Sequence, residues 1–318
     1  MRKAIVGGSI LVDRINDINV YPKPGELARI SAVSRTPGGL VPNTGTDIHV
    51  LAPDIPVFAC GKIGEDDDGR YLIGELQRRG LDTSGLAVTA DEPTSFTDVM
   101  SVPGGERTFF NCPGANASWG YDDFPFDLVS EGDIVLLGYF LLLAKVDAGD
   151  GVRMLRELKR RGAITAIDLV TEDSDRYALV RECLPYVDHL IVNETEAARL
   201  AGGDLPVSEL PSALLRFGVR ERVIVHMPEK GISCTKAGIR SEFPSCPVPP
   251  SFIKGKTGAG DAFCAGALVG IWRGLDEREI LRLGAIAAIG ALSAPGATEG
   301  MRSIEELAHI AEKLSNRE

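Results

Sequence analysis

The residues best suited to chemistry lie in a glycine-rich turn that runs from Lys254 to Asp261 and opens directly into a stretch of small and apolar residues. Such a stretch favours a buried helix. Backbone amides at a helix N-terminus bind anions, because they have no partner within the helix and the helix dipole adds positive potential. Gly258, Ala259 and Gly260 are therefore predicted to form an anion hole for a phosphoryl group in transfer. Asp261 would take the proton of an attacking hydroxyl, and an N-terminal helix cap is the alternative explanation for an aspartate at this position.

Two common nucleotide-binding motifs do not fit this chain. Gly255-Lys-Thr257 matches the end of a P-loop, but the first glycine of that motif would fall on Pro250. Val6-Gly7-Gly8-Ser9 lacks the GxGxxG spacing of a dinucleotide-binding fold. The predicted anion site therefore rests on the helix terminus at 258–260.

The elements that must position these residues alternate along the chain between short apolar runs and helical patterns. The predicted strands are Ala4–Val6, Val57–Cys60, Ile134–Leu137, Ile164–Ile167, Leu190–Val192 and Val223–Val225. The predicted helices are Gly69–Arg79, Gly151–Arg161, Glu194–Leu200, Ser208–Phe217, Asp261–Trp272, Glu277–Leu292 and Ile304–Leu314. Nearly continuous apolar strands that alternate with helices are typical of parallel sheets covered on both faces. The pattern predicts a large Rossmann-like α/β domain with a mostly parallel central sheet flanked by helices.

Two segments, 15–35 and 93–111, interrupt the alternation and are rich in strand-forming and turn residues. The second segment is predicted to be a hairpin, in which Pro103-Gly104-Gly105 joins Ser95–Val102 to Arg107–Phe110. We expect the two segments to form a small β-flap, or lid, over one edge of the α/β body. A surface hairpin without a function is the alternative.

No repeat or flexible linker divides the chain, so residues 1–318 are expected to form one domain into which the lid is inserted. Arg107, in the hairpin, is a candidate contact to a substrate, with surface pairing as its alternative. Asp168 follows the predicted strand Ile164–Ile167 at its carboxyl end, where ligands of open α/β sheets gather. It is expected near the phosphates, or else as a helix cap.

Charge and cysteine usage exclude several classes of partner. The 34 Lys and Arg residues against 45 Asp and Glu give a formal charge of −11, and no basic block is present, which argues against nucleic acid and anionic membranes as partners. The longest apolar runs, Ile134–Ala144 and Leu283–Leu292, are shorter than the roughly 20 residues of a membrane span. The six cysteines form no CxxC pair, so we expect them to be reduced and the protein to be cytoplasmic.

Four segments together resemble the ribokinase-like (PfkB) carbohydrate kinases. Thr257–Asp261 is similar to the C-terminal signature of that family, and Asn193-Glu-Thr-Glu196 matches its N-x-x-E motif. Gly38-Gly39-Leu-Val-Pro-Asn43 looks like its glycine pair followed by an asparagine, and Gly8–Asp13 resembles the first-strand loop whose aspartate holds sugar hydroxyls. The four segments follow the order of the family, so the resemblance covers essentially the full length.

The resemblance implies a lid that closes over a sugar and transfer of the γ-phosphate of ATP to a sugar hydroxyl. It assigns the sugar to Asp13, Gly38, Gly39 and Asn43. It also makes Asp261 the base and the amides of 258–260 the anion hole.

On the nucleotide side, the resemblance assigns Thr257 and Gly260 to the nucleotide and implies that Asn193 and Glu196 help to hold Mg²⁺ through water and phosphate oxygens. A hard cation such as Mg²⁺ prefers oxygen ligands and retains waters, which agrees with this assignment. The spacing of Asn193 and Glu196 also fits a capping box at the start of a helix, and both interpretations remain open.

The chain departs from the family pattern on the nucleotide side. The family's Thr-x-Gly-x-x-Gly run is replaced by His226-Met-Pro228-Glu-Lys-Gly231, which keeps only the last glycine and loses an amide at Pro228. His226, Gly231 and Ala285 are nevertheless expected beside the nucleotide, with His226 as a spacer and not a catalytic group. Gly255 replaces an acidic residue that supports a monovalent cation in relatives, which argues against strong potassium dependence.

These observations predict an ATP-dependent kinase of a small carbohydrate, with magnesium as its metal. A nucleoside kinase of the same fold is the nearest alternative, because the ribose of a nucleoside offers similar hydroxyls. A non-catalytic sugar- or nucleotide-binding relative is the second. Family resemblance also implies a homodimer paired through the lid. All of these functions require the polar residues of the first fifty positions to meet the 257–261 segment in space.

Overall fold

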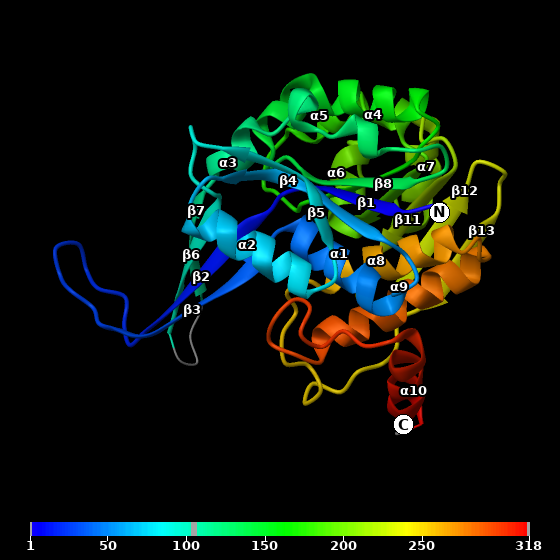
Figure 1. The fold of residues 1–318 in the computed structure, drawn as a ribbon. Helices are drawn as coiled ribbons and strands as arrows, with labels where there is room; N and C mark the ends of the chain where they lie inside the picture. Colours follow the sequence, from blue (N-terminus) through cyan, green and yellow to red (C-terminus); the bar gives the residue numbers. More distant parts are fainter. Residues whose placement is uncertain (1, 103–106, 317–318) are drawn as a thin grey trace.

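The computed structural model describes residues 2–102 and 107–316, and within those ranges thirteen strands form two sheets (Figure 1). The larger sheet has nine strands in this description. In order across the sheet they are β13 (Arg240–Pro244), β12 (Lys230–Thr235), β11 (Arg222–His226), β10 (His189–Asn193), β9 (Ile164–Leu169), β8 (Ile134–Phe140), β1 (Ala4–Gly8), β4 (Val57–Gly64) and β5 (Asp82–Thr89). The strands from β11 to β5 are parallel, and β12 and β13 continue the sheet in antiparallel fashion at one edge.

Helices cover both faces of this sheet (Figure 1). One layer contains α1 (Leu40–Leu51), α2 (Asp67–Arg78), α8 (Ala259–Trp272), α9 (Glu277–Leu292) and α10 (Ile304–Ser315). The opposite layer contains α4 (Gly151–Arg160), α5 (Tyr177–Arg181), α6 (Glu194–Ala201) and α7 (Leu210–Arg216), and the short α3 (Gly114–Ser118) packs beside β4. The predicted α/β class with a mostly parallel sheet is confirmed, and each of the six predicted strands falls within one of the observed strands.

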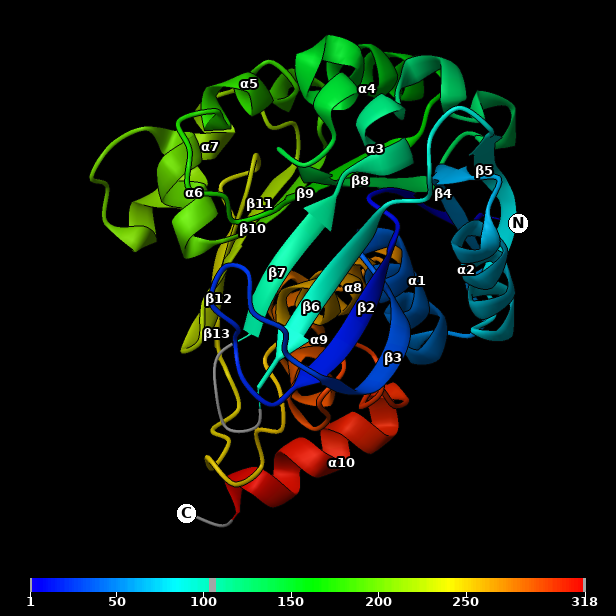
Figure 2. The ribbon, with the colours of Figure 1, turned by 90° about the vertical axis from the view of Figure 1, so that its left-hand side faces the viewer.

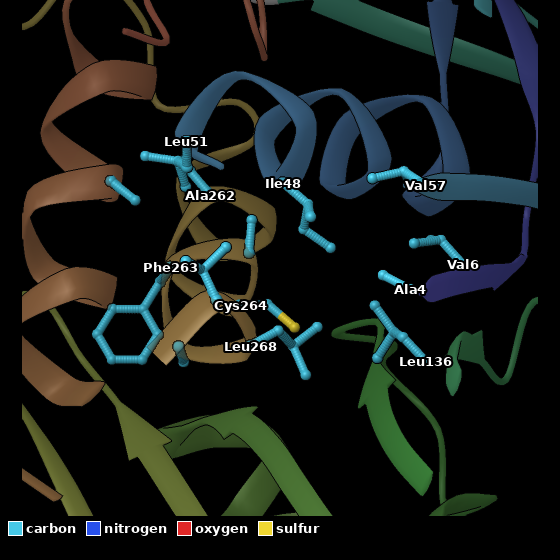
Figure 3. Close-up of a cluster of buried hydrophobic side chains, with 14 of the residues drawn as sticks. Ala4, Val6, Ile48, Leu51, Val57, Leu136, Ala262, Phe263, Cys264 and Leu268 are labelled. Carbon is cyan, nitrogen blue, oxygen red and sulfur yellow. The ribbon is translucent and has the colours of Figure 1, made fainter. Parts of the chain in front are cut away.

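Helices α1 and α8 pack against each other and against the sheet in the first hydrophobic core. Figure 3 shows Ile48 and Leu51 of α1 close to Ala262 and Leu268 of α8, with Val6 of β1 nearby. Because α8 is buried along most of its length, its N-terminus is held rigidly against the carboxyl ends of the parallel strands.

The sequence did not predict α1, and its burial explains why. Ten of its twelve residues are buried, so it lacks the polar face that makes a helix recognisable from its periodicity. It also contains Pro42 and Gly45, which are poor helix formers away from the first turn. Gly39, with φ 91°, precedes the helix, and a Cβ there would lie 2.6 Å from the carbonyl oxygen of Ser9, so only glycine fits.

The smaller sheet contains β3 (Ile30–Gly38), β2 (Leu11–Ile18), β6 (Phe96–Ser101) and β7 (Arg107–Cys112), in that order. It lies in front of α8 when the molecule is seen from the side in Figure 2. The predicted hairpin arms correspond to β6 and β7, which pair antiparallel, whereas the predicted turn at Pro103-Gly104-Gly105 lies outside the described residues. The boundaries differ from 15–35 because β2 begins at Leu11 and β3 runs on to Gly38.

One carboxylate joins the small sheet to the α/β body. Asp68, in the first turn of α2, accepts hydrogen bonds from Arg14 Nε of β2 (3.2 Å) and Arg35 Nη1 of β3 (3.3 Å). The Arg14 guanidinium also lies 3.8 Å from the ring centroid of Phe96, and that of Arg35 lies 3.9 Å from the ring of Tyr71. These contacts hold the face of the small sheet that carries Arg14 and Arg35 against α2. The opposite face of the small sheet points away from α2. In the described ranges, no helix is long and apolar enough to cross a bilayer.

Asp47, on the buried face of α1, is in an environment that is unfavourable for a charged carboxylate. Neither of its carboxylate oxygens has a hydrogen-bond partner within the described residues. Burial and the neighbouring Asp261 raise the pKa of Asp47 well above its ordinary value, with Arg79 acting in the opposite direction. The folded protein therefore binds the proton of this carboxyl more tightly than the unfolded chain does.

We expect Asp47→Asn to raise the free energy of unfolding by about 2 kcal/mol at pH 8 and by less at pH 5. Between the unfolded and the folded pKa only the folded state keeps the proton, so wild-type stability falls as the pH rises, and an amide escapes that loss. Urea denaturation at both pH values measures the difference.

Asp133→Asn is the matched control. Asp133 is also buried, but it accepts hydrogen bonds from the amides of Lys3 and Ser130 and pairs with the Lys3 ammonium at 3.0 Å. This variant should lose stability at pH 8. Equal losses in the two variants would contradict our interpretation of Asp47.

Candidate active site

The N-terminus of α8 brings together residues that are far apart in sequence. Asp261 accepts hydrogen bonds at Oδ2 from Asn43 Nδ2 of α1 (2.9 Å) and from the Tyr139 hydroxyl at the end of β8 (3.0 Å). Burial raises the pKa of Asp261 to about 6, while these two hydrogen bonds lower it and the charge of Glu196 raises it. At neutral pH the carboxylate is therefore ionised and still basic enough to accept a proton.

The backbone before Asp261 forms a tight turn that exposes amides. Gly258 is the N-cap of α8, with φ 79°, and a Cβ on it would lie 2.6 Å from Cβ of Ala297. The Ala259 N–H donates to the carbonyl oxygen of Lys256 (3.3 Å). In the part of the chain that is described, the amides of Gly260 and Asp261 have no acceptor, so they are the donors available to an anion.

Successive parallel strands deliver further polar groups to the same edge of the sheet. Asp168 lies near the end of β9, and Asn193 ends β10. Asn193 and Glu196 form the capping box of α6, and Glu196 Oε1 also accepts a hydrogen bond from Thr171 Oγ1 (2.8 Å). The capping interpretation is therefore correct for local structure, and the same box fixes the position of a buried carboxylate.

Burial and mutual repulsion make this edge favourable for a cation. Burial, Glu196 and Asp261 raise the pKa of Asp168 well above its ordinary value, and burial also raises that of Glu196. Within the described ranges, no three His, Cys, Asp or Glu side chains are arranged to ligate a metal directly. Oxygen groups that supply only part of a coordination sphere suit Mg²⁺, which usually keeps waters and binds substrate phosphates. The oxygen groups at this edge of the sheet therefore fit Mg²⁺, the metal that the family resemblance implies.

Two adjoining cavities meet at the N-terminus of α8. A cavity of about 270 Å³ is lined by polar groups that include Tyr139, Asp168, Glu196 and Asp261. A larger cavity of about 470 Å³ is lined mainly by apolar side chains of the β11–β12 turn, the 245–256 segment, α8 and α9. The residues common to the two linings are Asn193, His226, Lys256, Ala259 and Gly260. A ligand with an apolar ring and a charged tail fits this combination.

The residues predicted on the nucleotide side are placed differently from one another. Ala285 and His226 line the larger cavity, and the His226 ring stacks on Phe263 with 4.8 Å between centroids. Burial lowers the pKa of His226 to about 4, so its ring is neutral at physiological pH. Gly231 lies elsewhere: a Cβ there would meet Leu281 and Phe263, which makes it a packing glycine.

Thr257 and Gly255 frame the turn without lining either cavity. Thr257 is exposed, and its neighbour Lys256 reaches both cavities. A Cβ on Gly255 would lie 2.8 Å from the carbonyl oxygens of Ala294 and Pro295, so the position of the family's acidic residue has no room for a side chain here.

The residues that were predicted to bind the sugar lie together around the start of α1, with the exception of Arg107. Asp13, on β2, packs so closely on Gly38 that a Cβ there would lie 2.3 Å from Asp13 Oδ2. Burial raises the pKa of Asp13 to about 6. Gly38 and Gly39 lead directly into α1 and hence to Asn43, which contacts Asp261. Arg107 is exposed at the start of the edge strand β7.

Sequence reasoning missed Tyr139 and Thr171, and it mentioned Lys256 only as part of a rejected motif. Tyr139 follows the predicted strand Ile134–Leu137 by two residues, so its place at the carboxyl end of a parallel strand was the available signal. Thr171 has no such signal, because only the path of the chain after β9 brings it to Glu196.

Comparisons with known proteins agree with this fold. The family model described as pfkB family carbohydrate kinase matches residues 1–304, so the chain belongs to that family of sugar kinases. The membership predicted from the four motifs is thereby confirmed.

Several relatives illustrate the similarity. The chain is 27% identical over 307 residues to a ribokinase of Arabidopsis thaliana, which covers 93% of this chain and 78% of the relative. It is 26% identical over 243 residues to a fructokinase of Klebsiella pneumoniae, with 74% and 76% covered. The structure of Arabidopsis thaliana ribokinase complexed with ribose and ATP superposes with a TM-score of 0.84 at 25% identity, over 98% of this chain and 99% of that one. A ribokinase of Thermotoga maritima has a TM-score of 0.82 at 23% identity, over 98% of this chain and 100% of that one, which shows the shared fold.

The turn before α8 has a testable requirement for glycine. We expect Gly258→Ala to destabilise the protein by about 1 kcal/mol from its left-handed backbone, and by roughly 1–3 kcal/mol more from the clash with Ala297. Urea denaturation measures the sum.

Gly274→Ala separates the two contributions. Gly274, just beyond α8, has φ 67°, but a Cβ there meets nothing within 4 Å. The Gly274→Ala variant should lose only about 1 kcal/mol of unfolding free energy. If the two variants lost the same unfolding free energy, close packing of the turn against Ala297 would not contribute to the requirement for Gly258.

Proposed function

We propose that the protein is an ATP-dependent sugar kinase, which transfers the γ-phosphoryl group of MgATP to a hydroxyl of a small uncharged carbohydrate. One observation carries the proposal: the buried carboxylate of Asp261 adjoins two amides that have no acceptor among the described residues, at the N-terminus of α8, where the two cavities meet. A base beside an anion hole is the arrangement that phosphoryl transfer to a hydroxyl requires.

In the proposed reaction, Asp261 takes the proton of the acceptor hydroxyl as its oxygen attacks the γ-phosphorus. The bond between that phosphorus and the β–γ bridging oxygen breaks, and ADP departs with the bridging oxygen. The amides of Gly260 and Asp261 and the dipole of α8 stabilise the charge on the transferring group. Family membership supports a kinase of this kind.

The larger cavity is proposed to hold the nucleotide. Its apolar walls suit an adenine ring, and Lys256 and His226 line both cavities where these meet, so they would face the phosphates. The Arabidopsis ribokinase structure contains ATP, which supports ATP as the donor. A cytoplasmic location would supply ATP and keep the six cysteines of the chain reduced.

Magnesium is proposed to bind through water and phosphate oxygens near Asp168, Asn193 and Glu196. When bound, the ion would neutralise phosphate charge and relieve the repulsion between the buried carboxylates. Because Gly255 has no side chain, we expect little dependence on potassium.

The acceptor side favours a neutral polyol. Asp13 and Asn43 offer a carboxylate and an amide to hydroxyl groups, with Gly38 and Gly39 allowing close approach. A phosphorylated sugar would need a cation beside it. Arg35 is not available for this, because Asp68 and Tyr71 hold it on the face of the small sheet that packs on α2. We propose that the small sheet acts as the lid of a single domain and covers the acceptor, with Arg107 near its rim.

We expect Asp261→Asn to reduce turnover by at least 10³-fold, because an amide cannot accept the proton, while the Kd for the sugar changes little. ADP release against neutral sugars, sugar phosphates and nucleosides measures turnover, and calorimetry measures binding. Asp91→Asn, an exposed change on a surface loop, is the control for the charge change.

Each outcome of this panel identifies a different function. Turnover of neutral sugars supports the proposal, and turnover of nucleosides alone would make the protein a nucleoside kinase. Ligand binding without any ADP release would favour a non-catalytic binding protein. A wild-type rate in Asp261→Asn would refute its role as the base.

We also propose a homodimer paired through the small sheet. Its edge strands β3 and β7 expose Val33 (69%), Phe109 (62%) and Phe110 (58%), and large apolar side chains on open strand edges favour pairing with another sheet. Sedimentation should show a dimer for the wild-type protein and a monomer for Val33→Glu. A wild-type monomer at micromolar concentration would contradict the pairing.

A further inference from the structure

The backbone at the end of β8 has an unusual conformation. Among the non-glycine residues described, only Tyr139 (φ 58°) and Leu141 (φ 81°) have positive φ. The pairing of β8 with β9 is irregular between Leu137 and Phe140, so Tyr139 lies in a bulge. A bulky side chain in the left-handed region is strained, and such strain persists where the surrounding structure enforces it, often at functional sites.

The strained backbone directs the Tyr139 hydroxyl at Asp261. The hydroxyl donates to Oδ2 (3.0 Å), and Asn43 Nδ2 donates to the same oxygen (2.9 Å). No hydrogen bond to Oδ1 exists within the described residues. Two donors on one oxygen hold the carboxylate in a single orientation and leave its second oxygen available to a substrate hydroxyl.

The hydroxyl stays protonated in this environment. Burial and the charge of Asp261, with further contributions from Asp168 and Glu196, raise the pKa of Tyr139 well above its ordinary value. It therefore acts as a donor throughout the range in which an enzyme works. Among the described residues, the other ionisable groups near Asp261 are Asp47 of α1, Asp168 of β9, Glu196 of α6, His226 of β11, Cys264 of α8 and Lys256 of the preceding turn.

We propose that Tyr139 is a positioning residue for the proton acceptor of phosphoryl transfer. It holds Asp261 Oδ2 so that Oδ1 faces the attacking hydroxyl, and it keeps the carboxylate ionised by donating a hydrogen bond to it. Tyr139 keeps its own proton throughout, because the proton of the acceptor passes to Asp261. This inference rests on the proposed function and adds a residue that none of the sequence motifs contains.

Tyr139→Phe tests the proposal, because it keeps the ring and removes only the hydroxyl. We expect kcat to fall on the order of tenfold, with the Kd for the sugar unchanged. The acidic limb of the kcat/KM profile should move up by about one pH unit, because loss of a donor favours the protonated carboxyl. Tyr186→Phe is the matched control, since its hydroxyl accepts hydrogen bonds from Arg156 on the exposed surface of α4.

A second measurement separates this inference from the proposed function. The carboxyl ¹³C shift of Asp261, assigned with Asp261→Asn, gives its titration midpoint without any turnover. The midpoint should rise by about one unit in Tyr139→Phe and stay constant in Tyr186→Phe. An unchanged midpoint in Tyr139→Phe would overturn the positioning role, even in an active kinase. If the wild-type protein turns over no acceptor, the proposed function fails and the titration alone decides the role of Tyr139.

Discussion

A carboxylate that is removed from water and still kept ionised is the central physical constraint of this protein. Burial alone would protonate Asp261, and an exposed aspartate would be a weak base. The hydrogen-bond donors Asn43 and Tyr139 oppose that penalty on the ionised Asp261. Because these groups come from α1, β8 and α8, the packing of three distant elements sets the basicity of one side chain.

In the proposed reaction, the same edge of the sheet would accept polyphosphate although the chain carries a formal charge of −11. The net negative charge of the protein repels phosphate, so positive groups close to the site must attract it instead. The N-terminus of α8, Lys256 and a metal held near Asp168 and Glu196 would supply positive potential within a few ångströms, where the dielectric is low. In this arrangement, the buried carboxylates, which repel one another in the free protein, would become neighbours of a cation when substrate binds.

Several elements were predictable because their signals are local. The apolar runs of β1, β4 and β8–β11 and the periodic helices α2, α4 and α9 depend on neighbours in sequence, and so does the glycine turn before α8. Helix α1 was missed because burial on nearly all sides removes its amphipathic period. The antiparallel pair β12 and β13 was also missed, because β12 mixes polar and apolar residues although it is mostly buried and β13 is largely exposed, so neither shows a clear strand pattern without β11 beside them.

Residue types and their order were enough to identify the family and the α/β class, because these are properties of short segments. The meeting of Asn43, Tyr139 and Asp261, the place of Gly231 in packing and the engagement of Arg35 by Asp68 needed the folded chain. Distances between side chains separated by 100 or 200 residues follow from helix packing and strand order. No local pattern encodes them, so the working geometry of the site arises only when α1, β8 and α8 are packed together.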